Sequence, residues 1–400
     1  GERLLVENDR FGSMPLYYRE DGRGGIKVAS ELKFLVDPGR ERPDLAGLAD
    51  LLAISYHVRV ATPVAGITRL PLHHRLEYDV SGLRIARLPQ PGYPRDVPVD
   101  GESLAELDRL AGLYFRRLAD HQPRLSIALS GGLDSRLLLY SARRAGLDLV
   151  GFTSGEPGNI DVREACRLAE HVGLPIVPYE VDGRRFPGWF EAAVWLTEGR
   201  TPANHLHYMP ALLDGVTPPE PQINGVIGEA AVGGYLEHAS YRQATAAEQR
   251  RGCREFARRS ALYWPKKTRE SVMGPELREE ALGAHERVTH ELLGTLGLRG
   301  GYSDYLDFRF IYRGGLFGVP AFVSQISPMT DVVSPFLDAD FFDFGARLRS
   351  DDLAHRSVQL RWGLECMPGF GDLPRVKDGL VLPVRDDDPD SYDRALRRRS

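Results

Sequence analysis

Six residues, Ser130-Gly131-Gly132-Leu133-Asp134-Ser135, constrain the fold of this 400-residue chain more than any other feature. They follow a short apolar run, Leu125–Leu129, and precede a segment with helical spacing, Ser135–Ala145. Paired glycines at a strand-to-helix turn let the backbone turn tightly and surround an anion with N–H groups, and the helix N-terminus adds its positive end. The string therefore predicts a phosphate-binding loop in an α/β domain.

Asp134 makes this prediction more specific. A carboxylate inside an anion site would repel phosphate unless a cation lay between them, so Asp134 predicts bound Mg²⁺. The hydroxyls of Ser130 and Ser135 add hydrogen-bond donors. The alternative is an ordinary helix N-cap with glycines at a turn. The chain contains neither GxxxxGK[ST] nor a GxGxxG after a strand, which argues against a Walker-type hydrolase and a dinucleotide site.

The same region alternates strand and helix patterns. Strands are expected at Leu149–Thr153 and Ile176–Val181, with a helix at Val162–His171 between them. This alternation predicts a doubly wound parallel sheet, and an amphipathic helix over 104–118 is expected to open the domain. Two charge-rich helices are expected downstream, at 248–259 and 276–293, followed by a charged terminal tail.

The first hundred residues have a different pattern. Strands are expected at 4–6, 15–18 and 26–29, with turn residues between them, and a helix near 45–52. Repeated prolines then predict a linker at about 60–100. We therefore expect a β-rich domain over 1–95 and an α/β domain with a helical C-terminal part over 96–400.

Composition narrows the function classes. The net charge of −5 provides no field that would attract nucleic acid, and no apolar stretch approaches the roughly 20 residues of a spanning helix. Three separated cysteines, Cys166, Cys253 and Cys366, form no CxxC and predict no disulfide framework. We expect a cytoplasmic protein without nucleic-acid or membrane partners, and the oligomeric state stays open.

The loop and five further motifs resemble the asparagine synthetase family. Its SGGLDS string is similar to the pyrophosphate loop of N-type ATP pyrophosphatases. The other matching segments, in chain order, are Asp9–Gly12 with Pro15–Tyr18 and Ala29–Lys33, Ser154–Gly155 with Asp161, Gly225–Tyr235, Ser334–Asp338 and Arg375–Pro383. The resemblance implies an adenine nucleotide alpha hydrolase-like synthetase domain preceded by a partial Ntn-hydrolase-like glutaminase domain.

The resemblance also implies a reaction and a set of site residues. ATP activates a carboxylate as an acyl-adenylate, and an amine or ammonia then forms the amide, releasing AMP and pyrophosphate; asparagine biosynthesis from aspartate is the leading expectation. Asp134 and Glu229 would hold Mg²⁺, and Lys377 with Glu229 would be catalytic. The residues expected to bind ATP are Leu129, Ser130, Gly131, Gly132, Asp134, Ser135, Ser154, Asn224 and Gly225.

Three departures from the family pattern keep alternatives open. Glu229-Ala230 stands where the family has Asp-Glu, and Val226 stands where β-lactam-forming relatives have a tyrosine that acts in the base. Arg136 replaces the usual Ser or Thr, so its cation is expected to contact phosphate or to point to solvent. The alternatives are a lasso-peptide or β-lactam type cyclase and a catalytically silent nucleotide-binding scaffold.

Glutamine hydrolysis is not expected of this chain. In this family it needs an N-terminal cysteine, and residue 1 is glycine. Either an upstream piece carries that cysteine or the first domain is a remnant, in which case an amine within the substrate would replace ammonia. The acceptor carboxylate has no readable signature.

Overall fold

The computed structural model describes residues 3–54, 60–89, 94–199, 209–232, 331–349, 356–377 and 380–382, with scattered residues between 245 and 330 and at 352–353. For residues 50–54, 229–230, 377 and 380–382 it describes the backbone alone. Contacts divide the chain into two compact units. Unit 1 includes Gly1–Pro91, and unit 2 includes Gly92–Phe190, His207–Ala239 and Ile326–Ser400.

Unit 1 is rich in antiparallel strands. One sheet has the order β1 (Leu4–Glu7), β5 (His74–Asp79), β6 (Gly82–Arg87); the other has the order β3 (Ile26–Ala29), β2 (Tyr17–Glu20), β4 (Thr68–Arg69). The second sheet packs on the 3-10 helix η1 (Leu32–Leu35) through a buried cluster of Tyr17, Leu32, Leu35 and Ile67. Helix α1 spans Leu45–Ile54. The β-rich first region is thereby confirmed.

The expected linker at 60–100 is wrong for its first thirty residues. Strands β4, β5 and β6 all lie in it, and β5 pairs with β1 from the very start of the chain. Pro63, Pro71 and Pro89 fall outside these strands, where a missing N–H removes no ladder hydrogen bond. The prolines separate short strands here.

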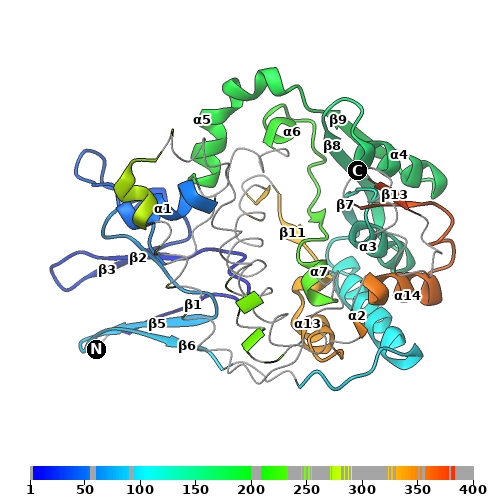
Figure 1. Ribbon diagram of the computed structural model, residues 1–400, viewed down its shortest axis with the longest axis horizontal. Coiled ribbons are helices and arrows are strands. Elements are labelled where there is room, and N and C mark those ends of the chain that lie inside the picture. The colour runs from blue at the N-terminus through cyan, green and yellow to red at the C-terminus, as the bar shows by residue number, and fades with distance from the viewer. Residues whose placement is uncertain are drawn as a thin grey trace. The chain divides into compact units, whose positions relative to one another are not determined.

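Unit 2 contains a five-stranded sheet in the order β11-β10-β7-β8-β9, with every neighbouring pair parallel (Figure 1). Its strands are β7 (Arg124–Ala128), β8 (Asp148–Gly155), β9 (Ile176–Glu180), β10 (Gln222–Ile223) and β11 (Val332–Val333). The sheet grows from β7 in both directions, which is the order of a doubly wound fold and makes the β7–β10 neighbourhood its topological switch point. The predicted α/β fold class is confirmed.

Helices cover this sheet and lead into a final hairpin. Helix α3 packs against α2 and α14, and α4 packs on β8, β9 and β12. Asp100 and Ser103 form a capping box at the start of α2, which confirms the expected amphipathic helix. The remaining elements of the described chain are α2 (Gly101–Ala119), α3 (Leu133–Arg144), α4 (Ile160–His171), η2 (Gly183–Arg185), α5 (Phe186–Thr197), α6 (Met209–Leu213), α7 (Gly228–Ala231), η6 (Pro335–Leu337), α13 (Ala339–Gly345), α14 (Ser357–Cys366), β12 (Arg375–Lys377) and β13 (Leu380–Leu382).

Two expectations fall mostly outside the described residues: the helices at 248–259 and 276–293, and the charged tail over 386–399. Within the described part of the chain, no helix is both long enough and apolar enough to span a membrane.

Candidate active site

The SGGLDS string forms the turn between β7 and α3, at the carboxyl edge of the parallel sheet. Gly132 is the N-cap of α3, with extended backbone and no side chain hydrogen-bonded to the helix end. An ordinary side-chain cap, the alternative considered from sequence, is therefore not what begins this helix. The N-cap has no side chain to occupy the first N–H groups of α3, so the electropositive end of the helix can bind an anion.

The two loop serines hold the loop itself. Ser130 Oγ lies 3.1 Å from Ser135 Oγ and accepts a hydrogen bond from the Gly132 N–H at 3.2 Å. Ser135 Oγ also accepts from the Ser130 N–H at 3.2 Å. Both hydroxyls therefore stabilise the conformation of the turn.

Asp134 is mostly buried and is held by two residues of α14 and its N-cap. Gln359 Nε2 donates to Asp134 Oδ1 at 2.8 Å, and Arg356 Nη1 lies 3.7 Å from Asp134 Oδ2. Burial raises the pKa of the Asp134 carboxyl, and the Arg356 charge and the Gln359 hydrogen bond partly offset that effect. No sequence pattern linked these residues, because more than 220 positions separate them.

The turn after β10 packs directly on Asp134. A Cβ placed on Gly225 would lie 3.0 Å from Asp134 Cβ, and one placed on Gly228 would lie 2.4 Å from Asp134 Oδ1. Gly228 begins α7, whose next residue is Glu229. The backbone of Glu229, the predicted second carboxylate, therefore directly follows Gly228, which packs against Asp134.

The strand that carries Lys377 is hydrogen-bonded to the same loop. The Val376 N–H donates to the Gly131 carbonyl at 2.7 Å, and Lys377 follows as the last residue of β12. A Cβ on Gly131 would lie 2.3 Å from Val376 Cγ2, so glycine is needed for this close approach. The loop therefore brings together backbone positions that sequence analysis could connect only through a family resemblance.

Three other predicted ATP-binding positions lie along the same sheet edge. Leu129 follows β7 and is buried, with its N–H bonded to the Phe152 carbonyl at 2.8 Å. Ser154 is near the end of β8, and its buried Oγ has no hydrogen-bond partner among the described residues. Asn224 follows β10, is buried, and accepts a hydrogen bond from the Val226 N–H at 3.0 Å.

Asp161 belongs to the Ser154–Gly155 segment that resembles the family, and the structure gives it a contact with the loop that the sequence does not predict. Its carboxylate, in the first turn of α4, accepts a hydrogen bond from the Gly131 N–H. Burial raises the pKa of this carboxyl, and the Gly131 hydrogen bond opposes the rise. An acidic residue in a first turn is also a routine helix-end preference, so nothing in the sequence predicts the contact between Asp161 and Gly131.

The expectation for Arg136 is corrected by its environment. Its side chain is 1% exposed, so it does not point to solvent. The guanidinium donates to the carbonyls of Phe370, Leu373 and Pro374, at 3.2, 2.7 and 2.6 Å. It therefore binds the segment that leads to β12.

The donors at Asp134 fit a magnesium ion. Gln359 Oε1 is a buried oxygen without a hydrogen-bond partner among the described residues, and it belongs to the amide bonded to Asp134. Carboxylate and amide oxygens are hard ligands of the kind that Mg²⁺ binds. Among described residues there is no group of three His, Cys, Asp or Glu side chains placed to hold a metal.

Known proteins match both units in sequence. Residues 1–88 match the family model described as a glutamine amidotransferase domain, and residues 115–293 match the one described as asparagine synthase. The carboxyethyl-arginine beta-lactam-synthase of Streptomyces clavuligerus is 26% identical over 228 residues, which cover 56% of this chain. The match spans 42% of that relative's length.

Solved structures give weaker likenesses. The NH3-dependent NAD synthetase of Campylobacter jejuni has a TM-score of 0.24 and 12% identity, covering 48% of this chain and 96% of that one. The NMN synthetase of Francisella tularensis has a TM-score of 0.27 and 13% identity, covering 52% and 92%. These scores are too low to assign a function. The two matching family models, in this order along the chain, and the synthase relative support an asparagine synthetase-family assignment.

Proposed function

We propose that this chain catalyses ATP-dependent amide bond formation through an acyl-adenylate, with AMP and pyrophosphate as products. The observation that carries the proposal is the convergence on one loop: Asp134 within it, the Gly225–Gly228 turn packed on Asp134, and β12 hydrogen-bonded to Gly131. Parallel-sheet enzymes bind their ligands at this edge, beside the topological switch point.

In the first step, a carboxylate oxygen of the acceptor attacks the α-phosphorus of ATP. The bond from that phosphorus to the bridging oxygen breaks, and pyrophosphate leaves. The N-terminal N–H groups of α3 and the Ser130–Ser135 turn would bind the phosphates. Leu129, Ser154, Asn224 and Gly225 would contact the adenosine from neighbouring strand ends.

In the second step, an amine attacks the acyl carbon, the bond to AMP breaks, and the nitrogen loses a proton. Lys377 would stabilise negative charge on the phosphate and on the tetrahedral intermediate. Asp134, Gln359 and Glu229 are the residues that would hold Mg²⁺, and the ion would neutralise charge on the leaving pyrophosphate. Arg356 balances the Asp134 charge and would have to move or share that carboxylate when the ion binds.

The acceptor is aspartate with ammonia, or an acid that carries its own amine. The second possibility is favoured by the 26% identity to the carboxyethyl-arginine beta-lactam-synthase, an enzyme named for forming a ring. We propose small-molecule or peptide carboxylates as substrates and a cytoplasmic location.

The test is pyrophosphate release from ATP and Mg²⁺ in the full chain. One set of reactions receives aspartate with ammonium or glutamine, and the other receives amine-bearing acids and peptides. Asp134→Ala should abolish release, whereas Asp340→Ala, which removes an exposed aspartate from the first turn of α13, should leave it unchanged. ATP binding without release for any acceptor would contradict the proposal and favour the silent scaffold.

A further inference from the structure

Arg136 is a buried, charged residue that has no role in the proposed reaction. It lies in the first turn of α3, directly after the phosphate-binding loop, and is among the largest fully buried side chains of the described chain. Burial lowers the pKa of its guanidinium, although arginine remains protonated in proteins. Burying a cation costs more than burying an alkyl chain of the same volume, so its contacts require an explanation.

Those contacts are mainly with backbone. Nη1 donates to the Phe370 and Leu373 carbonyls, Nη2 donates to the Pro374 carbonyl, and the Phe370 ring lies 5.7 Å from the guanidinium carbon. No described carboxylate lies within ion-pair distance of Arg136. The rigid guanidinium therefore fixes three carbonyls of an irregular segment at once, which lysine cannot do.

The segment that Arg136 binds, residues 367–374, leads into β12. It begins after α14 ends at Cys366 and becomes β12 at Arg375, next to Pro374. Val376 is then hydrogen-bonded to Gly131, five residues before Arg136 in the chain. The phosphate-binding loop and α3 thus hold the approach to Lys377 at two points.

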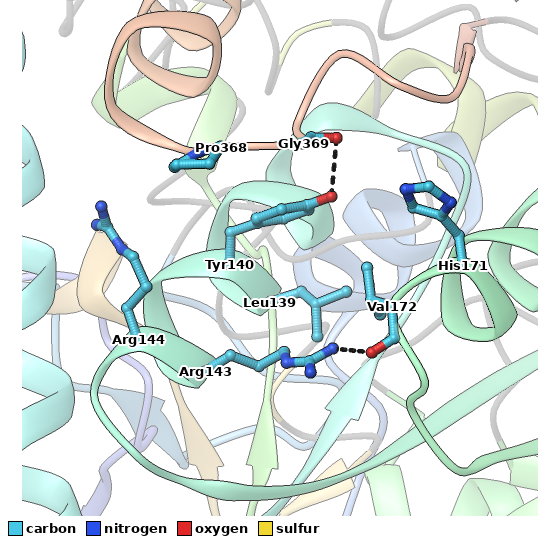
Figure 2. A pocket seen from close by; sticks show the side chains of 8 residues that line it. All are labelled: Leu139, Tyr140, Arg143, Arg144, His171, Val172, Pro368 and Gly369. Carbon is cyan, nitrogen blue, oxygen red and sulfur yellow. Dashed lines mark hydrogen bonds between the residues drawn. The ribbon is translucent and has the colours of Figure 1, made fainter.

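Tyr140 adds a third attachment one turn further along α3. Figure 2 shows its hydroxyl donating to the Gly369 carbonyl, at 3.0 Å, beside a pocket lined by residues of α3, α4 and this segment. Arg136 and Tyr140 are four residues apart, so they lie on one face of the helix.

We propose that Arg136 is a positioning residue: it sets the place of the Lys377-bearing strand relative to the phosphate-binding loop. The inference rests on the proposed function, because it assumes that Lys377 acts on the substrate. Reacting groups must be held close to their productive geometry by the residues around them, and Arg136 supplies that support through the backbone.

The direct test is amide hydrogen exchange of residues 370–382 in the full chain. Arg136→Met should speed exchange of the Val376 amide by at least roughly tenfold, because the segment opens locally more often. Arg144→Met is the matched control: Arg144 also comes from α3 and donates to a carbonyl, that of Cys366 at 2.7 Å, but before the segment begins. It should leave Val376 exchange unchanged.

Activity provides the second readout. Arg136→Met should lower kcat for pyrophosphate release by about 10²-fold, since displacement of a reacting group by an ångström costs that much, with little change in KM for ATP. Arg136→Lys should recover only part of the loss. In a Lys377→Ala background the Arg136 substitution should cost almost nothing more, because the two residues act through one group.

Two results would overturn the inference: unchanged Val376 exchange in Arg136→Met, or additive losses in the double variant. Amide hydrogen exchange at Val376 does not depend on catalytic turnover. If the wild-type chain released no pyrophosphate, the proposed function would be refuted, but the exchange experiment would still test the role of Arg136. If Arg136→Met does not fold, Tyr140→Phe, which removes one attachment and no charge, should give a smaller increase in exchange at 369–376, and no increase would likewise refute the role.

Discussion

Replacing Gly131 by alanine tests the close approach between the phosphate-binding loop and β12. The new Cβ would lie 2.3 Å from Val376 Cγ2 and 2.8 Å from Val376 Cβ, whereas ordinary contact begins at 3.4 Å. The Val376 methyl group must therefore retreat by about 1.1 Å, and Lys377 is the next residue. A shift of that size predicts a loss in kcat of about 10²-fold.

The free energy of unfolding should also fall. Overpacking of a close-packed site costs about 1–3 kcal/mol, and Glu164 Cβ, 3.1 Å from the new atom, limits relaxation on the other side. Urea denaturation measures the stability, and coupled pyrophosphate release measures the rate.

A control and a rescue make the explanation specific. Gly132→Ala meets only Ser130 Oγ, at 3.3 Å, and Gly132 has a φ of −76° that alanine adopts freely, so its stability cost should be below about 1 kcal/mol. Val376→Gly should restore much of the rate in the Gly131→Ala background, because it removes both clashing atoms. Native stability and rate in Gly131→Ala would refute the steric argument.

Three further predictions concern single side chains. Asp134→Asn should abolish pyrophosphate release and remove a loss of stability that accompanies rising pH. With its pKa raised by burial, Asp134 in the folded chain keeps its proton to higher pH than in the unfolded chain, so the free energy of unfolding falls as pH rises from about 3.8 to the folded-state pKa; urea midpoints across that range measure this slope. Asn8→Ala should destabilise unit 1 by about 1–3 kcal/mol, as measured by thermal unfolding, because the Asn8 side chain bonds the Leu70 and Pro71 carbonyls and the His74 N–H. Gly228→Ala should cost about 1–3 kcal/mol in urea denaturation, because its Cβ would lie 2.7 Å from the buried Phe336 ring.

The strand and helix alternation in the first half of unit 2, and the position of the SGGLDS loop within it, could be predicted from the sequence alone. Apolar runs and helical spacing along 125–181 correspond to β7, α3, β8, α4 and β9 with ends shifted by a few residues. These features were readable because each depends on neighbours a few positions away: side-chain period, paired glycines and the change from strand to helix. The short strands β4, β5 and β6 cannot be recognised in the sequence, because the prolines around them predict a linker.

The residues that surround the loop could be identified only from the packing of distant elements. Arg356 and Gln359 reach Asp134, Val376 bonds Gly131, and Arg136 turns inward to bind carbonyls more than 230 residues away. A side chain's partners depend on which elements pack together, and a buried guanidinium and an exposed one have the same sequence signature. The loop's chemistry is local, while its neighbours are set by the doubly wound sheet that brings distant strand ends to one edge.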